Sequence, residues 1–259
     1  MRPLESRGSR FTLKMDFLIS IFNTILYQPL FNALVFLYQY LPGRDFGVAV
    51  IALTVIIRII LYPLMMQSIK SQKILSELQP KIQEVQQQFK NDKEKQTRAT
   101  MELYKKEKIN PFGGCLPLLL QFPILIALYQ VFWKGLQPGA MRHLYSFTPN
   151  PGVIDPTFFG FMNLAVPNLW LAFLAGVLQF FQSKMLTPKT LKTEKKTGQM
   201  TQFSNTMQKQ MLYFFPVFTV FILWKLPSAI GLYWIITSLF SIGQQYLIFK
   251  KTAVQPKND

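Results

Sequence analysis

The sequence predicts an all-α polytopic membrane protein, with a core of five transmembrane helices, a cytoplasmic helical hairpin and an N-terminal interfacial amphipathic helix. Three observations lead to this fold class. Half of the 259 residues are hydrophobic, and they gather in runs of the length that membrane spans need. Lysine and arginine concentrate in the loops between alternate runs. One of these loops, residues 67–110, is long, polar and patterned as helix.

Residues 1–16 are expected to form a flexible N-terminus, and residues 17–45 an interfacial amphipathic helix region. In the second region polar residues such as Asn23 and Asn32 recur at helical spacing, opposite a side of Leu, Ile, Phe and Val. Pro29 interrupts the pattern, so one or two helices lying in the outer interface fit it. The alternative is a sixth span, which would place the basic N-terminus inside.

Five apolar runs within residues 46–249 are the expected spans. The fourth is the weakest, because its uncharged stretch between Lys209 and Lys225 makes only about 23 Å of helix. The basic loops that follow the first and third runs are assigned to the cytoplasm by the positive-inside rule, together with the short basic C-terminal tail, residues 250–259. The N-terminus is then outside. The runs lie near residues 46–66, 115–133, 161–181, 208–226 and 228–249.

The loop of residues 67–110 is predicted to form the cytoplasmic hairpin, inserted between the first and second spans. Apolar residues recur every three or four positions along its first half, and Asn91-Asp92 is a plausible turn before a second helix. The stripe comprises Ile74, Leu78, Ile82, Val85 and Phe89. Ten basic and six acidic residues do not by themselves indicate RNA, so no direct nucleic-acid recognition is expected. We expect a docking surface for a partner or a nascent chain; a mere spacer is the alternative.

Arg58 is the residue that points most directly to function. It lies inside the first apolar run, where a charged side chain costs roughly 3 kcal/mol on insertion scales. All twelve Asp and Glu residues lie outside the apolar runs, so an acidic partner within the membrane is missing. A polar cavity around Arg58 is expected, and snorkelling toward the helix end is the alternative. Gln121, alone among apolar neighbours in the second run, should face the same interior or make an ordinary interhelical hydrogen bond.

Catalytic chemistry finds little support in the sequence. The single cysteine, Cys115, and the single histidine, His143, provide neither a zinc site nor a nucleophile–base pair with an acid nearby. A phosphate-binding GxxxxGK[ST] motif is absent from the sequence. The chain is therefore expected not to be an enzyme, and no metal or cofactor is expected.

Four stretches resemble, in order, the YidC/Oxa/Alb family of membrane protein insertases. They are GVAVIALTVIIRIILYPL at 47–64, LQPKIQ at 78–83, LYKKEKINPFGGCLPLLLQFPILIALY at 103–129 and LPSAIGLYWIITSLFSIGQQY at 226–246. The third is the most specific, because its Asn-Pro, Gly-Gly-Cys and Gln-x-Pro elements occur in sequence. The resemblance is collinear over nearly the whole chain.

The resemblance implies a five-helix core with a hydrated, positively charged groove that is open to the cytoplasm and to lipid. Arg58 and Thr54 of the first span, Gln121 of the second, and Tyr233 and Trp234 of the last fall on its groove positions. The function implied is insertion and folding of integral membrane proteins in the bacterial plasma (inner) membrane. The alternative from the residues alone is a small anion transporter or channel that uses Arg58 as its binding site.

The implied partners are nascent membrane protein clients and the lipid bilayer, with the ribosome, signal recognition components and the Sec translocon as further candidates. Two departures from the family pattern bear on this. The segment Pro227–Leu232 is longer than the usual Pro-x-Gly-Leu element. The C-terminal tail is short, which places direct docking of the tail on the ribosome in doubt.

Overall fold

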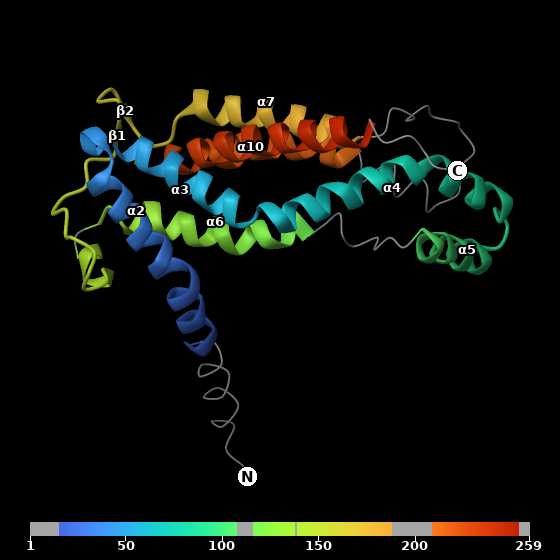
Figure 1. Cartoon of the computed structure of the whole chain (residues 1–259). Helices are drawn as coiled ribbons and strands as arrows, with labels where there is room; N and C mark the ends of the chain where they lie inside the picture. The colour runs from blue at the N-terminus through green and yellow to red at the C-terminus, as the bar shows by residue number, and fades with distance from the viewer. Residues whose placement is uncertain (1–15, 108–115, 138, 188–208, 254–259) are drawn as a thin grey trace, which may run out of the picture.

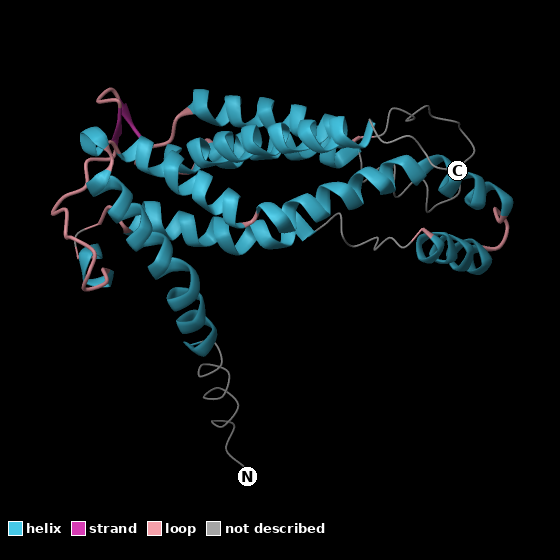
Figure 2. Cartoon of the chain, in the orientation of Figure 1, coloured by secondary structure: helices cyan, strands magenta, loops and turns pink. Residues whose placement is uncertain are grey.

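The structure is a computed structural model, and it describes residues 16–107, 116–137, 139–187 and 209–253. Within these ranges the chain is mostly helical, with a single small antiparallel pair of strands (Figure 2). The helical character and the apolar spans confirm the expectation of an all-α membrane protein at this coarse level.

Four long helices and one shorter one run side by side as a bundle (Figure 1). Consecutive members run in opposite directions, and α10 packs against both α7 and α3. The members are α3 (Phe46–Ile60), α6 (Leu116–Lys134), α7 (Leu169–Leu186), α9 (Phe215–Leu223) with the π-helical turn Gln210–Phe214 before it, and α10 (Ser228–Ala253).

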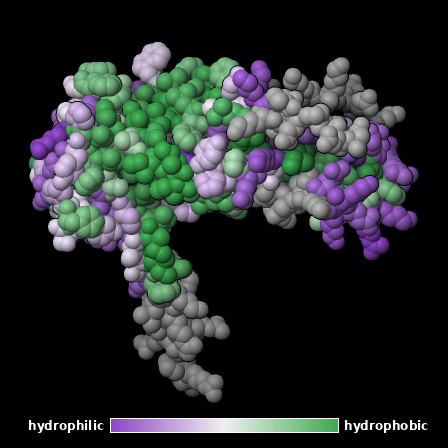
Figure 3. All heavy atoms as spheres, viewed as in Figure 1, coloured by the Kyte–Doolittle hydropathy of each residue, from purple (hydrophilic) through white to green (hydrophobic). Residues whose placement is uncertain are grey.

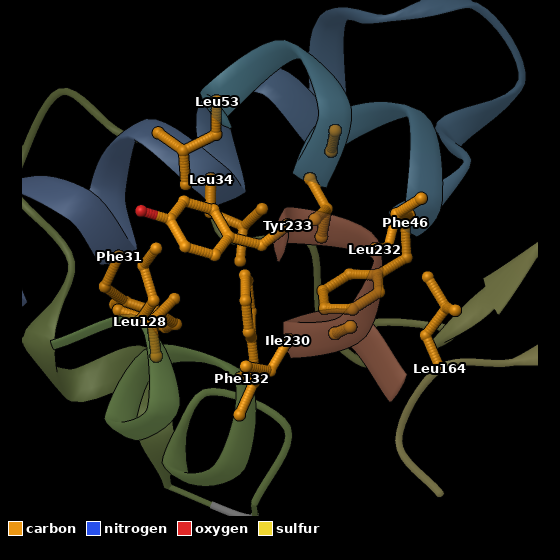
Figure 4. Packing of buried hydrophobic residues seen from close by; sticks show 14 of the residues in the cluster. Phe31, Leu34, Phe46, Leu53, Leu128, Phe132, Leu164, Ile230, Leu232 and Tyr233 are labelled. Atoms are coloured by element: carbon orange, nitrogen blue, oxygen red, sulfur yellow. The ribbon is translucent and has the colours of Figure 1, made fainter. Parts of the chain in front are cut away.

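The apolar core lies where α3, α6 and α10 meet the N-terminal helix. Figure 4 shows the ring of Tyr233 among Leu34, Leu53 and Phe132, which come from different helices. All four side chains are almost fully buried. On the face seen in Figure 3, the bundle is hydrophobic over most of its length, and hydrophilic side chains gather toward its two ends. That distribution is the one expected of a protein that lies in a bilayer.

Among the described residues, three helices are long and apolar enough to cross a membrane, by length and composition: Asp16–Tyr40, Leu169–Leu186 and Ser228–Lys250. The bent pair Phe46–Ile60 and Tyr62–Val85 makes a fourth if it counts as one span. Leu119–Lys134 and Gln210–Leu223 are apolar but shorter. Helices lie at the positions of the five expected spans, but three or four of the described helices pass as membrane spans and these include the N-terminal helix, so the five-span core stays a prediction.

Residues 16–40 form one continuous helix, which is one of the two arrangements that the sequence allows. Asp16–Tyr40 passes through Pro29 without a break, because a π-helical turn at Asn23–Tyr27 precedes α2 (Gln28–Tyr40), in which the proline occupies the first turn. A widened turn at this point accommodates the missing N–H of proline. This helix diverges from the bundle toward the N-terminus (Figure 1).

The first expected span is broken near its end. Helix α3 ends at Ile60, α4 (Tyr62–Gln88) begins after Leu61, and the two axes are bent by 66°. Pro63 lies in the first turn of α4, where backbone N–H groups have no partner within the helix, so the missing N–H of proline costs no hydrogen bond. Helix α4 therefore runs from the bundle directly into the hairpin, so the hairpin's first helix begins before residue 67.

The hairpin consists of α4 and α5 (Lys93–Lys106), which pack against each other beyond the end of the bundle (Figure 1). Asp92 caps α5 by accepting a hydrogen bond from the Lys95 backbone N–H, and this bond holds the pKa of the Asp92 carboxyl below its usual range. Leu78 and Ile82 of α4 are buried, but Ile74 is exposed.

The opposite end of the bundle carries the connections between helices. A helical turn at Pro42–Arg44 leads into α3, and a second turn, Ala140–His143, follows α6. Strands β1 (Thr157–Phe158) and β2 (Met162–Asn163) pair antiparallel, with Thr157 opposite Asn163 and Phe158 opposite Met162. The β1–β2 strand pair precedes α7, and the sequence pattern does not predict it.

Candidate functional site

Arg58 lies in the last turn of α3 and is only 6% exposed. Across the described residues, its guanidinium makes no ion pair with a carboxylate. The break after Ile60 places this cation at a helix C-terminus, where the helix dipole stabilises positive charge by roughly 0.3–1 kcal/mol. That contribution is smaller than the cost of burying an arginine within a membrane. Arg58 is therefore a buried cation whose charge is not neutralised by any described residue.

Thr54 stands one helical turn before Arg58 on the same side of α3 and is likewise buried. Its hydroxyl donates to the Val50 carbonyl at 2.6 Å, which leaves the hydroxyl oxygen available as an acceptor. Such bonding back to the preceding turn lets a hydroxyl exist in an apolar helix without an external partner.

Gln121 of α6 and Tyr233 of α10 meet across the bundle. The Gln121 side-chain amide donates to the Tyr233 hydroxyl, with Nε2 and Oη 2.7 Å apart. Tyr233 is almost fully buried, and Arg58 of α3 lies near enough for the charges of the two side chains to influence each other. Thr54, Arg58, Gln121 and Tyr233 are grouped here as one polar cluster, in which the hydrogen bond between Gln121 and Tyr233 joins α6 to α10.

Trp234 is held by a different helix. Its indole Nε1 donates to Oε1 of Gln179 on α7 at 2.9 Å. The next residue along α10 after Tyr233 thus links α10 to α7 and not to the Arg58 cluster. Of the five residues expected at the site, the structure brings four together and places Trp234 at the neighbouring contact.

Sequence reasoning missed Gln179, and it also missed the buried polar residues of α10 beyond Tyr233. Gln179 could have been found, because it stands alone among apolar residues from Leu169 to Phe181, as Gln121 does in its own run. On α10, buried polar residues recur beyond Tyr233. They are Thr237, Ser238, Ser241, Gln244 and Gln245.

These α10 residues lead from the Arg58 cluster toward the α3–α4 break. Gln244 donates through Nε2 to the Tyr62 carbonyl at 3.3 Å, just beyond the break. Ser68, in α4, is also buried. Ser238 Oγ and Gln245 Oε1 are buried without a hydrogen-bond partner in the described part of the protein. Buried polar atoms of this kind are normally satisfied by protein or by water.

The described residues contain no cluster of three or more His, Cys, Asp or Glu side chains that could hold a metal ion. Cys115 lies outside the described residues. The site offers a cation, an amide, a phenol and a hydroxyl, and such groups can bind anions and hydrogen-bonding partners without a covalent step.

Comparison with known proteins places the chain in a family. The family model described as 60Kd inner membrane protein matches residues 36–255. Among similar proteins, the membrane protein insertase YidC of Fusobacterium nucleatum subsp. nucleatum is 36% identical over 81% of this chain and 88% of its own length. YidC of Clostridium tetani is 37% identical over 81% and 84%.

In longer relatives, the match covers only part of the relative's length. YidC of Psychromonas ingrahamii is 38% identical over 86% of this chain but only 35% of its own length. The family match covers the Arg58 cluster, the hairpin and α10. This chain belongs to the 60Kd inner membrane protein family, which is the YidC/Oxa/Alb family that its motifs resemble.

Proposed function

We propose that this chain is a membrane protein insertase and folding chaperone of the bacterial inner membrane. The observation that carries the proposal is the burial of Arg58, without a carboxylate partner among the described residues, in a polar cluster shared by α3, α6 and α10. The family membership and the names of the relatives support the same function.

The proposed mechanism is physical. A hydrated groove at the cluster shortens the hydrocarbon path that a polar client segment must cross. Arg58 supplies a positive field in a setting where charges interact more strongly than in water. An acidic segment of a nascent membrane protein dwells at Arg58, while its apolar helix partitions into lipid along the greasy outer faces of the bundle. Hydrophobic partition then drives release.

Hydration of the groove is supported by the orphaned polar atoms. Ser238 Oγ and Gln245 Oε1 need partners, and both lie beyond Tyr233 on the part of α10 that runs toward the hairpin end of the bundle. Water reaching them from the hairpin end would satisfy both and would continue toward Arg58. The groove is accordingly proposed to open toward the hairpin, taken as the cytoplasmic side, and sideways to lipid.

The proposed topology has five spans, with the N-terminus outside and the C-terminus in the cytoplasm. The N-terminal helix is proposed to lie in the outer interface because it diverges from the bundle (Figure 1). Its polar side is also hydrogen-bonded to the loop that follows α6. Asn32 there accepts from the Tyr145 backbone N–H at 2.7 Å and donates to the His143 carbonyl at 3.1 Å. Partners are nascent membrane proteins; the ribosome, signal recognition components and the Sec translocon remain candidates.

The rival function is an anion transporter or channel that uses Arg58 as its binding site. Purified protein in liposomes separates the two functions. We expect a single-span client with a short acidic translocated segment to become protease-protected, and chloride loaded in the same vesicles to stay inside. Chloride efflux without client insertion would overturn the insertase and favour the channel.

The same liposomes test the groove itself. On a Cys115→Ser background, Thr54→Cys and Gln121→Cys should react with a membrane-impermeant thiol reagent from the hairpin side only. Leu174→Cys, exposed on the apolar face of α7, is the matched control and should react slowly from either side. Reaction of the two cysteines from both sides would indicate a pore, and protection from both sides would contradict a hydrated groove.

A further inference from the structure

The strand pair β1–β2 ends in a tip that exposes aromatic side chains at the end of the bundle opposite the α4–α5 hairpin (Figure 1). Phe161 is 76% exposed and Phe159 is 67% exposed. A few residues further on, Trp170 in the first turn of α7 is 80% exposed. Three large aromatic side chains in one short stretch are unusual on a surface that faces only water.

The stretch is also uncharged. From Pro156 through Ser183 the sequence contains 28 residues without a Lys, Arg, Asp or Glu. Helix α7 begins only at Leu169, so the uncharged run extends well beyond the span itself and takes in the whole strand pair. The exposed tip is therefore continuous in sequence with the apolar outer face of α7, which carries exposed Phe173 and Leu174.

Much of the backbone of the tip is hydrogen-bonded within the protein, which lowers the cost of placing it near the apolar region of a membrane. Strand pairing uses part of the backbone, and side chains or nearby carbonyls bond several further N–H groups. The Asp45 carboxylate, which also caps α3, accepts from the Phe159 N–H. Further N–H donors in this stretch bond to Asp155 Oδ1 (from Thr157), Phe158 O (from Phe161), Pro156 O (from Leu164) and Asn163 Oδ1 (from Ala165).

Phe159 occupies a strained position. Its φ of 50° is left-handed, where a bulky residue costs about 1–2 kcal/mol and where Gly or Asn is the usual choice. Gly160 follows with φ of 74°. A phenylalanine held at such a position points to a use for an exposed aromatic ring there.

The tip is tied rigidly to the arginine-bearing helix. Phe158 packs directly on Gly47 of α3, where any Cβ would meet the phenyl ring at 2.1 Å. The Phe158 and Phe159 rings stack with their centroids 4.4 Å apart. Any force on the exposed rings is thereby transmitted to the start of α3, thirteen residues before the break that follows Arg58.

We propose that the β1–β2 tip inserts Phe159 and Phe161 into the headgroup–acyl boundary of the leaflet at its end of the bundle, as a lipid anchor. Aromatic residues are enriched at that depth, and the exposed Trp170 lies in the first turn of α7, shortly after the strand pair in sequence. The occupant is the bilayer surface, since the tip continues the lipid-facing surface of α7 and carries no charge to pair with a protein partner. The anchor sets the depth of α3, and hence of Arg58.

Depth-dependent fluorescence tests the proposal on the full-length chain in phospholipid vesicles. On a Cys115→Ser background, Phe161→Cys carries an environment-sensitive fluorophore, and Asn150→Cys, exposed in the preceding loop, is the matched control. We expect nitroxide groups high on the lipid acyl chains to quench most of the Phe161→Cys emission, and aqueous iodide to leave it unchanged. The control should show the reverse.

A second measurement leaves the tip unaltered. The chain without substitutions, in vesicles that contain a phospholipid with a photoreactive group near its ester carbonyls, should acquire lipid adducts within residues 156–170. Iodide quenching at Phe161→Cys with no such adducts would overturn the proposal. An emission shift that required an added protein would also overturn it, and would identify the tip as a protein-binding surface.

Discussion

Arg58 combines two properties that oppose each other at the residue scale. Burial in a membrane bundle disfavours its charge, yet the guanidinium cannot lose its proton. The helix end after Ile60 offsets part of that cost, but it is not an anion. A visiting carboxylate would therefore gain more at Arg58 than at a surface cation, which is the physical basis of the proposed insertion mechanism.

The first prediction concerns this charge. Arg58→Ala should slow insertion of a client with an acidic translocated segment by about tenfold or more, because a contact between unit charges at an effective dielectric constant near 20 has a Coulomb energy of about 4 kcal/mol. Arg58→Lys should retain most activity, since field matters more than guanidinium geometry. Protease protection of reconstituted clients measures this.

The matched control for this prediction is Arg142→Ala, which removes the same charge from the exposed loop at the opposite end. It should leave insertion unchanged. Equal insertion of acidic and neutral clients by the Arg58→Ala protein would show that charge attraction is not the mechanism.

The second prediction concerns the hydrogen bond between Gln121 and Tyr233. A double-mutant cycle with Gln121→Leu and Tyr233→Phe should give a coupling energy of about 0.5–1.5 kcal/mol, as for other interhelical hydrogen bonds in membranes. Reversible unfolding in mixed micelles measures it. Tyr129→Phe, on an exposed tyrosine of α6, should change stability little. Additive single effects would mean that the bond is not formed in the membrane.

Residue-scale prediction from sequence works where one polar residue stands alone in an apolar run. Arg58 and Gln121 stand out in this way, and the structure places both in one cluster with Tyr233. Which partner a residue takes is a different matter. Tyr233 and Trp234 are adjacent in sequence, but only the structure shows that the first faces α6 and the second faces α7.

At the scale of elements, the break between α3 and α4 is the feature that hydropathy could not reveal. The run from 46 to 66 is continuously apolar, so it reads as one span. The bend depends on Pro63 together with a contact from Gln244, which lies 182 residues from Tyr62 in sequence. Pairings that distant are set by the tertiary fold and leave no local pattern in the sequence.

The hairpin has a thin core. Leu78 and Ile82 of α4 are buried, whereas the residues that α5 buries are Gln96 and Thr100. An ion pair between Lys81 and Glu107, with N and O 3.1 Å apart, joins the helices at the surface, where such pairs contribute little. An element with so little apolar contact opens at low free-energy cost. We therefore expect the hairpin to be dynamic and to regulate access to the groove.

The third prediction quantifies that core. Leu78→Ala should destabilise the hairpin by about 2 kcal/mol, the low end for a buried leucine, because the surroundings are thinly packed. Amide hydrogen exchange in α5 should then accelerate about 30-fold. Ile74→Ala, at a position 41% exposed on the same stripe, is the matched control and should change exchange little. Equal effects of the two substitutions would contradict the packing of α5 on Leu78.

At the scale of the whole molecule, the topology depends on the N-terminal helix, for which charge and geometry favour opposite orientations. The basic residues near the N-terminus favour an inside position, and Asp16–Tyr40 is long and apolar enough to span. Two observations favour an outside N-terminus: this helix diverges from the bundle, and Asn32 is hydrogen-bonded to the loop after α6. A helix that diverges from a bundle of membrane spans lies closer to the membrane plane than they do.

The fourth prediction decides this topology. On a Cys115→Ser background, Asp16→Cys should react with a membrane-impermeant maleimide from the side that labels Asn150→Cys, and not from the side that labels Glu94→Cys at the hairpin. The reason is that a helix fastened by Asn32 to one end of the bundle, with its polar side against that end, keeps both of its own ends in one interface. Labelling of Asp16→Cys only from the Glu94→Cys side would show that Asp16–Tyr40 crosses the bilayer, and would give the protein six spans with an inside N-terminus.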